Sequence, residues 1–247
     1  MPSNVKGDLQ MSNPTRFTSG ISTAYSGETL YSFPFPDPFH TGSTQGLGSS
    51  VYANDFNTLI GTDYTVTGSS SAFALSNSIV GGAGVLTPGG TTTASAAYKN
   101  GTFFQFQAGN RAWFSTRIQA SAVAGSVSFY VGLRNGSGVT DGLWFAKAAS
   151  STSINLVSTV GSTATTLVTG VATAAAATWV ELGWYYDGTD LLVYANSALV
   201  ARVSAPTIGS SATTLTNVML GPVFQITPTA TDTLSVDFVL TAQELSR

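Results

Sequence analysis

The sequence of 247 residues contains no cysteine and a single histidine, and both shortages exclude kinds of chemistry. Without cysteine the chain cannot form a disulfide, a cysteine-ligated zinc site or a thiol nucleophile. The histidine, His40, cannot build a transition-metal site of the usual kind, and a Ser-His-Asp triad would depend on it alone. Because His40 lies in a segment rich in Pro, Gly, Ser and Thr, we expect it to have a packing or surface role, and we expect no metal or other cofactor.

Charged residues are also scarce. They make up 9% of the chain, against roughly 25% in an ordinary globular protein. The net charge is −3 and the nine basic residues are scattered, so no nucleic-acid partner is expected. The sequence has no apolar run long enough to cross a bilayer, and no signal-peptide core near its N-terminus. We therefore expect no membrane association, and folding in a reducing cytoplasm.

Carboxylate pairs suited to acid/base chemistry are not evident. Glycoside hydrolysis usually needs two carboxylates roughly 5–10 Å apart, and the glutamates are far apart in sequence: Glu28, Glu181 and Glu244. The close acidic pairs, Asp187/Asp190 and Asp232/Asp237, are typical of turns and strand surfaces. Calcium bound by the first pair stays open, although no EF-hand loop is present. The sequence thus predicts no catalytic residue and no enzyme.

The sequence contains many runs that are typical of β-strands. Apolar and polar residues alternate in Val127–Arg134, in Ala112–Gln119, in Trp179–Tyr186 and in Leu234–Leu240, with Asn-Gly and Asp-Gly turn signals between such runs. This pattern predicts an all-β, antiparallel two-sheet sandwich over residues 51–247. The residues expected on its inner faces are Phe114, Ile118, Val127, Phe129, Val131, Leu182, Trp184, Val236 and Phe238.

Residues 1–50 differ from the rest and are predicted to form an extended N-terminal arm. The run Phe33-Pro34-Phe35-Pro36-Asp37-Pro38-Phe39 can be neither a helix nor a central strand, because proline fixes φ and removes backbone donors. The alternating rings are too apolar for a simple linker. Two alternatives stay open: Phe33, Phe35 and Phe39 fill pockets on another protein, or the arm folds back over its own domain.

The same alternation predicts an outward patch. Trp113, Arg117, Tyr130 and Arg134 would lie together on the outer sides of two paired strands, and these residue types often anchor interfaces. We predict a subunit interface at these four residues. The alternative is a loop of the same subunit that covers Trp113.

One stretch carries a family resemblance. Trp179–Gly188, Leu191–Asn196 and Leu199–Ala201 describe three antiparallel strands around two tight turns, and this arrangement resembles the concanavalin A-like (laminin-G-like) sandwiches. The closing run Leu234–Phe238 is similar to the last strand of that superfamily. The resemblance implies a jelly-roll fold. The Glu-x-Asp-x-x-Glu string of its glycosidases and the Asp/Asn metal loop of its lectins do not occur here.

Within that superfamily the chain most resembles bacteriophage head-decoration (cement) proteins, with an N-terminal arm, few charges and a Ser/Thr/Gly/Ala-rich sandwich. The resemblance implies a homotrimer on the exterior of a virion, bound to the major capsid protein, with Phe33, Phe35 and Phe39 as capsid anchors. The alternative is a carbohydrate-binding module or fibre tip, in which aromatic residues stack on sugars; the candidates are Trp144, Trp184, Tyr185 and Tyr186. A bacterial surface protein is a third hypothesis, and the absence of a signal peptide counts against it.

Overall fold

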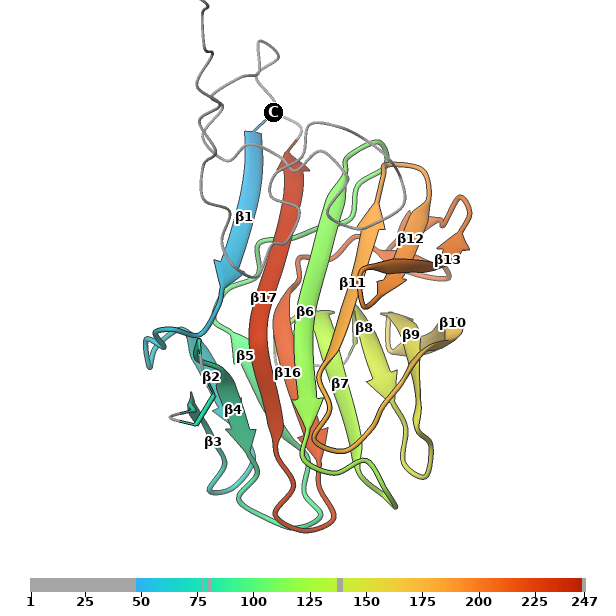
Figure 1. Ribbon diagram of the computed structural model, residues 1–247. Coiled ribbons are helices and arrows are strands. Elements are labelled where there is room, and N and C mark those ends of the chain that lie inside the picture. Colours follow the sequence, from blue (N-terminus) through green and yellow to red (C-terminus); the bar gives the residue numbers. More distant parts are fainter. Residues whose placement is uncertain (1–47, 77, 80, 137–139, 246–247) are drawn as a thin grey trace, which may run out of the picture.

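The computed structural model describes residues 48–76, 78–79, 81–136 and 140–245, and these form two antiparallel sheets packed face to face (Figure 1). The eight-stranded sheet follows the order β13 (Ala198–Val203), β12 (Leu191–Ala195), β11 (Val180–Tyr186), β6 (Ala112–Ala120), β17 (Leu234–Leu245), β4 (Gly84–Thr87) and β3 (Ala72–Leu75), and β1 (Gly48–Asn54) also pairs with β17.

The seven-stranded sheet lies behind it in Figure 1. Its order is β10 (Thr163–Thr173), β9 (Ser153–Val160), β8 (Gly142–Lys147), β7 (Ser128–Arg134), β16 (Gly221–Thr227), β5 (Ser95–Lys99) and β2 (Tyr64–Thr67). A short parallel pair, β14 (Ile208–Gly209) and β15 (Leu215–Thr216), adjoins β8 and β9. The predicted all-β two-sheet sandwich is confirmed. None of the described residues forms a helix, so none of them belongs to a helix able to span a membrane.

The core lies between the two sheets. Alternate residues of each strand point into it, as the period of two requires. Eight of the nine predicted inner residues belong to this core: Phe114, Ile118, Val127, Phe129, Val131, Leu182, Trp184 and Val236. Phe114 and Trp184 stack with their ring centroids 5.9 Å apart. These contacts confirm the inward and outward assignment for β6, β7 and β11.

The ninth residue, Phe238, departs from the prediction. The register of β17 against β6 shifts between Val236 and Phe238, which makes Asp237 the extra residue of a β-bulge. Beyond the bulge Phe238 pairs with Arg117, whose side chain is 44% exposed, while Val239 joins the core. Phe238 is buried, but on the outward face. The alternation predicted for Leu234–Leu240 is therefore correct only as far as Val236.

The predicted three-stranded unit at residues 179–201 is present as β11, β12 and β13. Asp187 closes the first turn, since its Oδ1 accepts hydrogen bonds from the backbone N–H groups of Thr189 (2.8 Å) and Asp190 (2.7 Å). The second turn places Asn196 and Ser197 at positive φ (47° and 66°), as the tightest hairpin turns require. β1 begins at Gly48, so the boundary predicted at residue 50 falls inside this strand.

Candidate functional site

A groove lies on the outward face of the seven-stranded sheet. It has a volume of about 530 Å³, a size common among ligand sites. Its walls come from β7, β8, β9, β10 and β16, and its lining residues are Tyr130, Arg134, Trp144, Ala146, Ala148, Asn155, Val157, Thr159, Ser162, Ala164, Thr166, Val223 and Gln225. Neighbouring strands thus present an aromatic pair, small side chains and hydrogen-bonding groups to one shallow space.

Trp144 lies along this face because two glycines leave room for its indole. A Cβ on Gly142 would come within 2.4 Å of the Trp144 ring, and a Cβ on Gly132 would lie 2.7 Å from the Trp144 Cβ. Trp144 then meets Tyr130 edge to face, with their centroids 6.3 Å apart and the rings at 89°. The indole is 4% exposed, and its Nε1–H has no hydrogen-bond partner. A buried donor without a partner carries an energetic cost.

Polar groups stand beside the aromatic pair. Arg134 donates from Nη1 to Oε1 of Gln225 (3.1 Å) and from Nε to the Gly136 carbonyl (2.9 Å), which holds the guanidinium in place. Burial lowers the pKa of Arg134, and the nearby Tyr98 partly offsets this shift. Across the groove, Oδ1 of Asn155 accepts from Ser153 Oγ and from the Gly170 N–H, which fixes that amide. The Oγ1 of Thr159 is buried without a hydrogen-bond partner.

This arrangement suits a neutral or anionic ligand with rings and many hydroxyl groups. The lining residues that the structure describes include no Asp or Glu, whereas Arg134, Gln225 and Asn155 can hydrogen-bond to hydroxyl or carboxylate oxygens. No group of three or more His, Asp or Glu that could hold a metal ion is found within the described ranges. Calcium at Asp187 and Asp190 is not favoured, since Asp187 closes a turn and Asp190 binds Arg202 and the Ala205 N–H.

The structure separates the predicted outward patch. Tyr130 and Arg134 lie on β7 in the groove, but Trp113 and Arg117 lie on β6 in the other sheet. The two strands are not neighbours, and their outward faces point to opposite sides of the sandwich. The prediction that the four residues lie together is therefore wrong, because period-two alternation shows that a side chain faces outward but not from which sheet. A subunit interface at any of them stays a prediction.

Other predicted residues are distributed as follows. Trp144 is in the groove, Trp184 and Tyr186 are in the core, and Tyr185 is on the outward face of the eight-stranded sheet. Glu181 accepts from Ser197 Oγ beside the second hairpin turn. Phe33, Phe35, Phe39 and His40 lie outside the described residues. The sequence analysis did not identify Gln225 and Asn155 as groove residues. Their outward positions in strands of alternating pattern could have marked them as candidates.

Comparisons place the fold among known proteins. No family model matches the chain, and no curated protein matches its sequence. A solved protein of unknown function from Shewanella oneidensis MR-1 is similar, with 12% identity, a TM-score of 0.57, and coverage of 81% of this chain and 89% of that one. An endo-1,3-beta-glucanase from Streptomyces sioyaensis is also similar, with 11% identity, a TM-score of 0.56, and coverage of 83% and 99%. So is the exoplasmic/lumenal domain of VIP36 in a Ca²⁺/Man3GlcNAc-bound form, with 10% identity, a TM-score of 0.50, and coverage of 76% and 86%.

The chain has the concanavalin A-like jelly-roll fold. At these identities the comparisons show the fold, and nothing in them identifies a phage capsid decoration protein. They also correct the prediction that the chain is not an enzyme, since a glucanase shares the fold over 83% of the chain. The absence of one carboxylate string was too narrow a basis for that exclusion, because a fold can host acid/base residues at many positions.

Proposed function

We propose that the groove on the outward face of the seven-stranded sheet binds a carbohydrate. The observation that carries the proposal is the Tyr130–Trp144 pair beside the Arg134–Gln225 hydrogen bond in one groove. Sugars present apolar C–H faces and hydroxyl edges, and this groove offers the partly exposed Tyr130 ring to the first and fixed donors to the second. The sandwich fold shared with a glucanase and with a glycan-bound lumenal domain is consistent with this role.

Binding of the full chain to an array of immobilised glycans, followed by calorimetry with the best oligosaccharide, tests the proposal. Tyr130→Ala should weaken that binding by about tenfold or more, which corresponds to about 1.4 kcal/mol. Trp144→Phe keeps a ring but removes part of the surface that packs against Tyr130, and it should also weaken binding. Phe103→Ala is the matched control, since Phe103 is exposed and is not among the groove-lining residues.

Equal affinity in the Tyr130 variant, the Trp144 variant and the Phe103 control would contradict the proposal. Release of reducing ends, measured in the same incubations, shows whether a bound glycan is also cleaved. This separates a binding module from a hydrolase on the same face.

Capsid decoration stays a separate prediction. It rests on the arm and on the composition of the chain, and its elements are a major capsid protein as partner, a homotrimer and a position on the virion exterior. Co-sedimentation of the full chain with purified capsids tests it. Loss of co-sedimentation in a variant with Phe33, Phe35 and Phe39 changed to Ala would support their role as anchors.

A further inference from the structure

The two amide side chains that line the groove have their oxygen atoms held by donors of the protein itself. Arg134 Nη1 can only donate, so the Gln225 atom that it meets at 3.1 Å is the carbonyl oxygen, Oε1. The backbone N–H of Gly170 can also only donate, and it meets Oδ1 of Asn155 at 2.9 Å. These partners fix which end of each amide is oxygen and which is nitrogen.

The nitrogen ends of the two amides remain for a ligand. Asn155 Oδ1 accepts a second hydrogen bond, from Ser153 Oγ (3.0 Å), so the bonds that the described residues make with both amides all go to oxygen. Both side chains are partly exposed and both line the groove. Each amide nitrogen carries two hydrogens that it can donate. Gln225 Nε2 and Asn155 Nδ2 are therefore donors that a ligand in the groove can use.

The register places the two amides at the ends of one row across the sheet. Gln225 of β16 pairs with Tyr130 of β7. Tyr130 pairs with Ala146 of β8, and Ala146 pairs with Asn155 of β9. All four residues line the groove. Three strand spacings, about 14 Å, separate the backbones of the two amide residues. A single sugar unit is too small to meet both amides, so the row suits a chain of several units.

The side chains of the groove offer many donors and few acceptors. Arg134 and the two amide nitrogens only donate, and the lining residues in the described ranges include no Asp or Glu. A sugar hydroxyl needs an acceptor for its own hydrogen, whereas a carboxylate or a sulfate only accepts. Hydrogen bonds to an anionic oxygen are also roughly twice as strong as those between neutral groups. The groove therefore matches an anionic sugar better than a neutral one.

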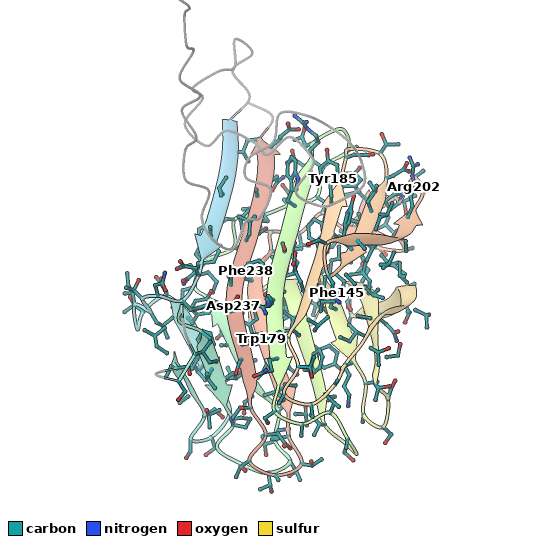
Figure 2. All side chains as sticks on the ribbon, viewed as in Figure 1. Phe145, Trp179, Tyr185, Arg202, Asp237 and Phe238 are labelled. Carbon is teal, nitrogen blue, oxygen red and sulfur yellow. The ribbon has the colours of Figure 1, made fainter. Side chains whose placement is uncertain are left out.

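The negative net charge of the chain is compatible with an anionic ligand at this position. Asp237 and Asp190 belong to ion pairs at the eight-stranded sheet, and Figure 2 shows Asp237 and Arg202 on that sheet, whereas the groove is on the other one. Asp141, directly before β8, is buried and accepts a hydrogen bond from Thr216 Oγ1 (2.7 Å). At physiological ionic strength exposed charges are largely screened beyond about 8 Å. The local donors therefore outweigh the net charge.

We infer that the groove selects an acidic polysaccharide, with Gln225 Nε2 and Asn155 Nδ2 donating to carboxylate or sulfate oxygens on separate sugar units. The inference rests on the proposed carbohydrate site and names the class of sugar that this site takes. The Tyr130 ring supplies the apolar contact that acidic and neutral sugars share. The two amides determine specificity, because their nitrogens only donate and an anionic group only accepts.

Calorimetry of the full chain with ligand pairs that differ only in charge tests this inference. Tetramers of galacturonic, glucuronic and mannuronic acid are compared with their methyl esters, and a sulfated galactan tetramer with its desulfated form. The best acidic tetramer should bind about tenfold or more tightly than its uncharged counterpart, and than the acidic monomer. Its affinity should fall as salt is raised. The pair that shows the difference distinguishes a carboxylate ligand from a sulfate ligand.

Asn155→Asp removes the donors at one end of the row with little change in shape. A carboxylate oxygen at this position can still accept from the Gly170 N–H, so the side chain stays in place. Binding of the acidic tetramer should weaken by about tenfold or more, and that of its uncharged counterpart by less than about threefold. Gln225→Glu should act in the same way. Asn196→Asp is the matched control, since Asn196 Oδ1 also accepts a backbone N–H, that of Glu181 (3.1 Å), beside a turn of the other sheet.

The outcomes separate this inference from the proposed function. Equal affinities within every charged and uncharged pair would overturn the inference, and so would equal losses in Asn155→Asp and Asn196→Asp. If neutral glycans alone bind, and bind more weakly to Tyr130→Ala, the carbohydrate site stands and its selection of acidic sugars is overturned. If neither acidic nor neutral glycans bind, both the carbohydrate site and the inference are overturned.

Discussion

At the scale of single residues, the position of Trp144 depends on two neighbours that have no side chain, Gly142 and Gly132. Its indole crosses the outward face of β8 over Gly142 and beside Gly132. Any side chain at position 142 would occupy the volume that the ring now fills. The aromatic edge of the groove therefore depends on two residues that contribute no chemistry of their own.

Gly142→Ala tests this dependence. The added methyl would lie 2.4 Å from the Trp144 ring and 2.5 Å from the Leu133 carbonyl oxygen, so we expect a loss of about 1–3 kcal/mol in unfolding free energy. Glycan binding should weaken as well, since the ring must move. Denaturant unfolding and calorimetry measure the two effects. Gly61→Ala is the control, because a Cβ there meets nothing within 4 Å; equal behaviour of the two variants would contradict the account.

Residue types and alternation predicted part of the site. Trp144 was named from the sequence as a candidate for stacking on sugars, whereas Tyr130 and Arg134 were named for a subunit interface, because bulky or charged residues in strands stand out. The glycines beneath Trp144 and the amides of Gln225 and Asn155 were not. Their role depends on which strands are neighbours, and the pairing of β8 with β7 and of β7 with β16 is long-range information.

At the scale of elements, β17 shows where a regular pattern fails. Its twelve residues pair with β1, β4 and β6, so it is an interior strand of the eight-stranded sheet. The predicted alternation holds to Val236, and the bulge at Asp237 then exchanges the two faces. Val239 becomes a core residue and Phe238 a residue of the outward face. The sequence carries no local sign of this exchange, since Phe238, Val239 and Leu240, which follow the bulge directly, are all apolar.

Deleting Asp237 should therefore leave the faces of the residues that follow it unchanged. Without the extra residue, Val236, Phe238 and Val239 pair one to one with Ile118, Arg117 and Thr116, so Phe238 stays outward and Val239 stays in the core; we expect a folded variant that loses about 1–3 kcal/mol. Asp237→Asn keeps the bulge and removes the charge that pairs with the half-exposed Arg117, so it should cost less than about 1 kcal/mol. Chemical denaturation compares the two variants, and failure of the deletion variant to fold would contradict this account of the register.

At the scale of the whole molecule, the scarcity of charge leaves the pH dependence of stability to a few groups. Lys147 is 0% exposed on the inner side of β8, where its Nζ donates to the Val127 carbonyl. Burial lowers the pKa of Lys147. Burial also raises the pKa of Tyr64, and raises that of Tyr185 to about 12. Lys147 and Tyr64 titrate in the core and Tyr185 titrates on the outward face of the eight-stranded sheet. Exposed ion pairs contribute little to the pH dependence beside these groups.

Whether each group makes stability rise or fall with pH follows from the linkage between protonation and folding. Between the lowered pKa of folded Lys147 and its ordinary value of 10.5, the unfolded chain binds more protons, so stability rises with pH. Above about pH 10 the unfolded tyrosines ionise while folded Tyr64 and Tyr185 stay protonated, so stability falls. We therefore expect the unfolding free energy to be greatest at mildly alkaline pH, roughly 9–10.

Lys147→Met isolates the first of these effects. The variant should be more stable than the parent at pH 7, by roughly 1–3 kcal/mol, because it removes a buried charge while retaining an unbranched apolar chain. The difference should shrink as the pH approaches 10.5, where the parent no longer buries a charge that the unfolded chain would carry. Urea unfolding from pH 6 to 11 measures both curves. A constant difference across that range would show that Lys147 has the same pKa in the folded and the unfolded chain, which would contradict this account. A less stable variant at pH 7 would show that the bond to Val127 outweighs the cost of burying the charge.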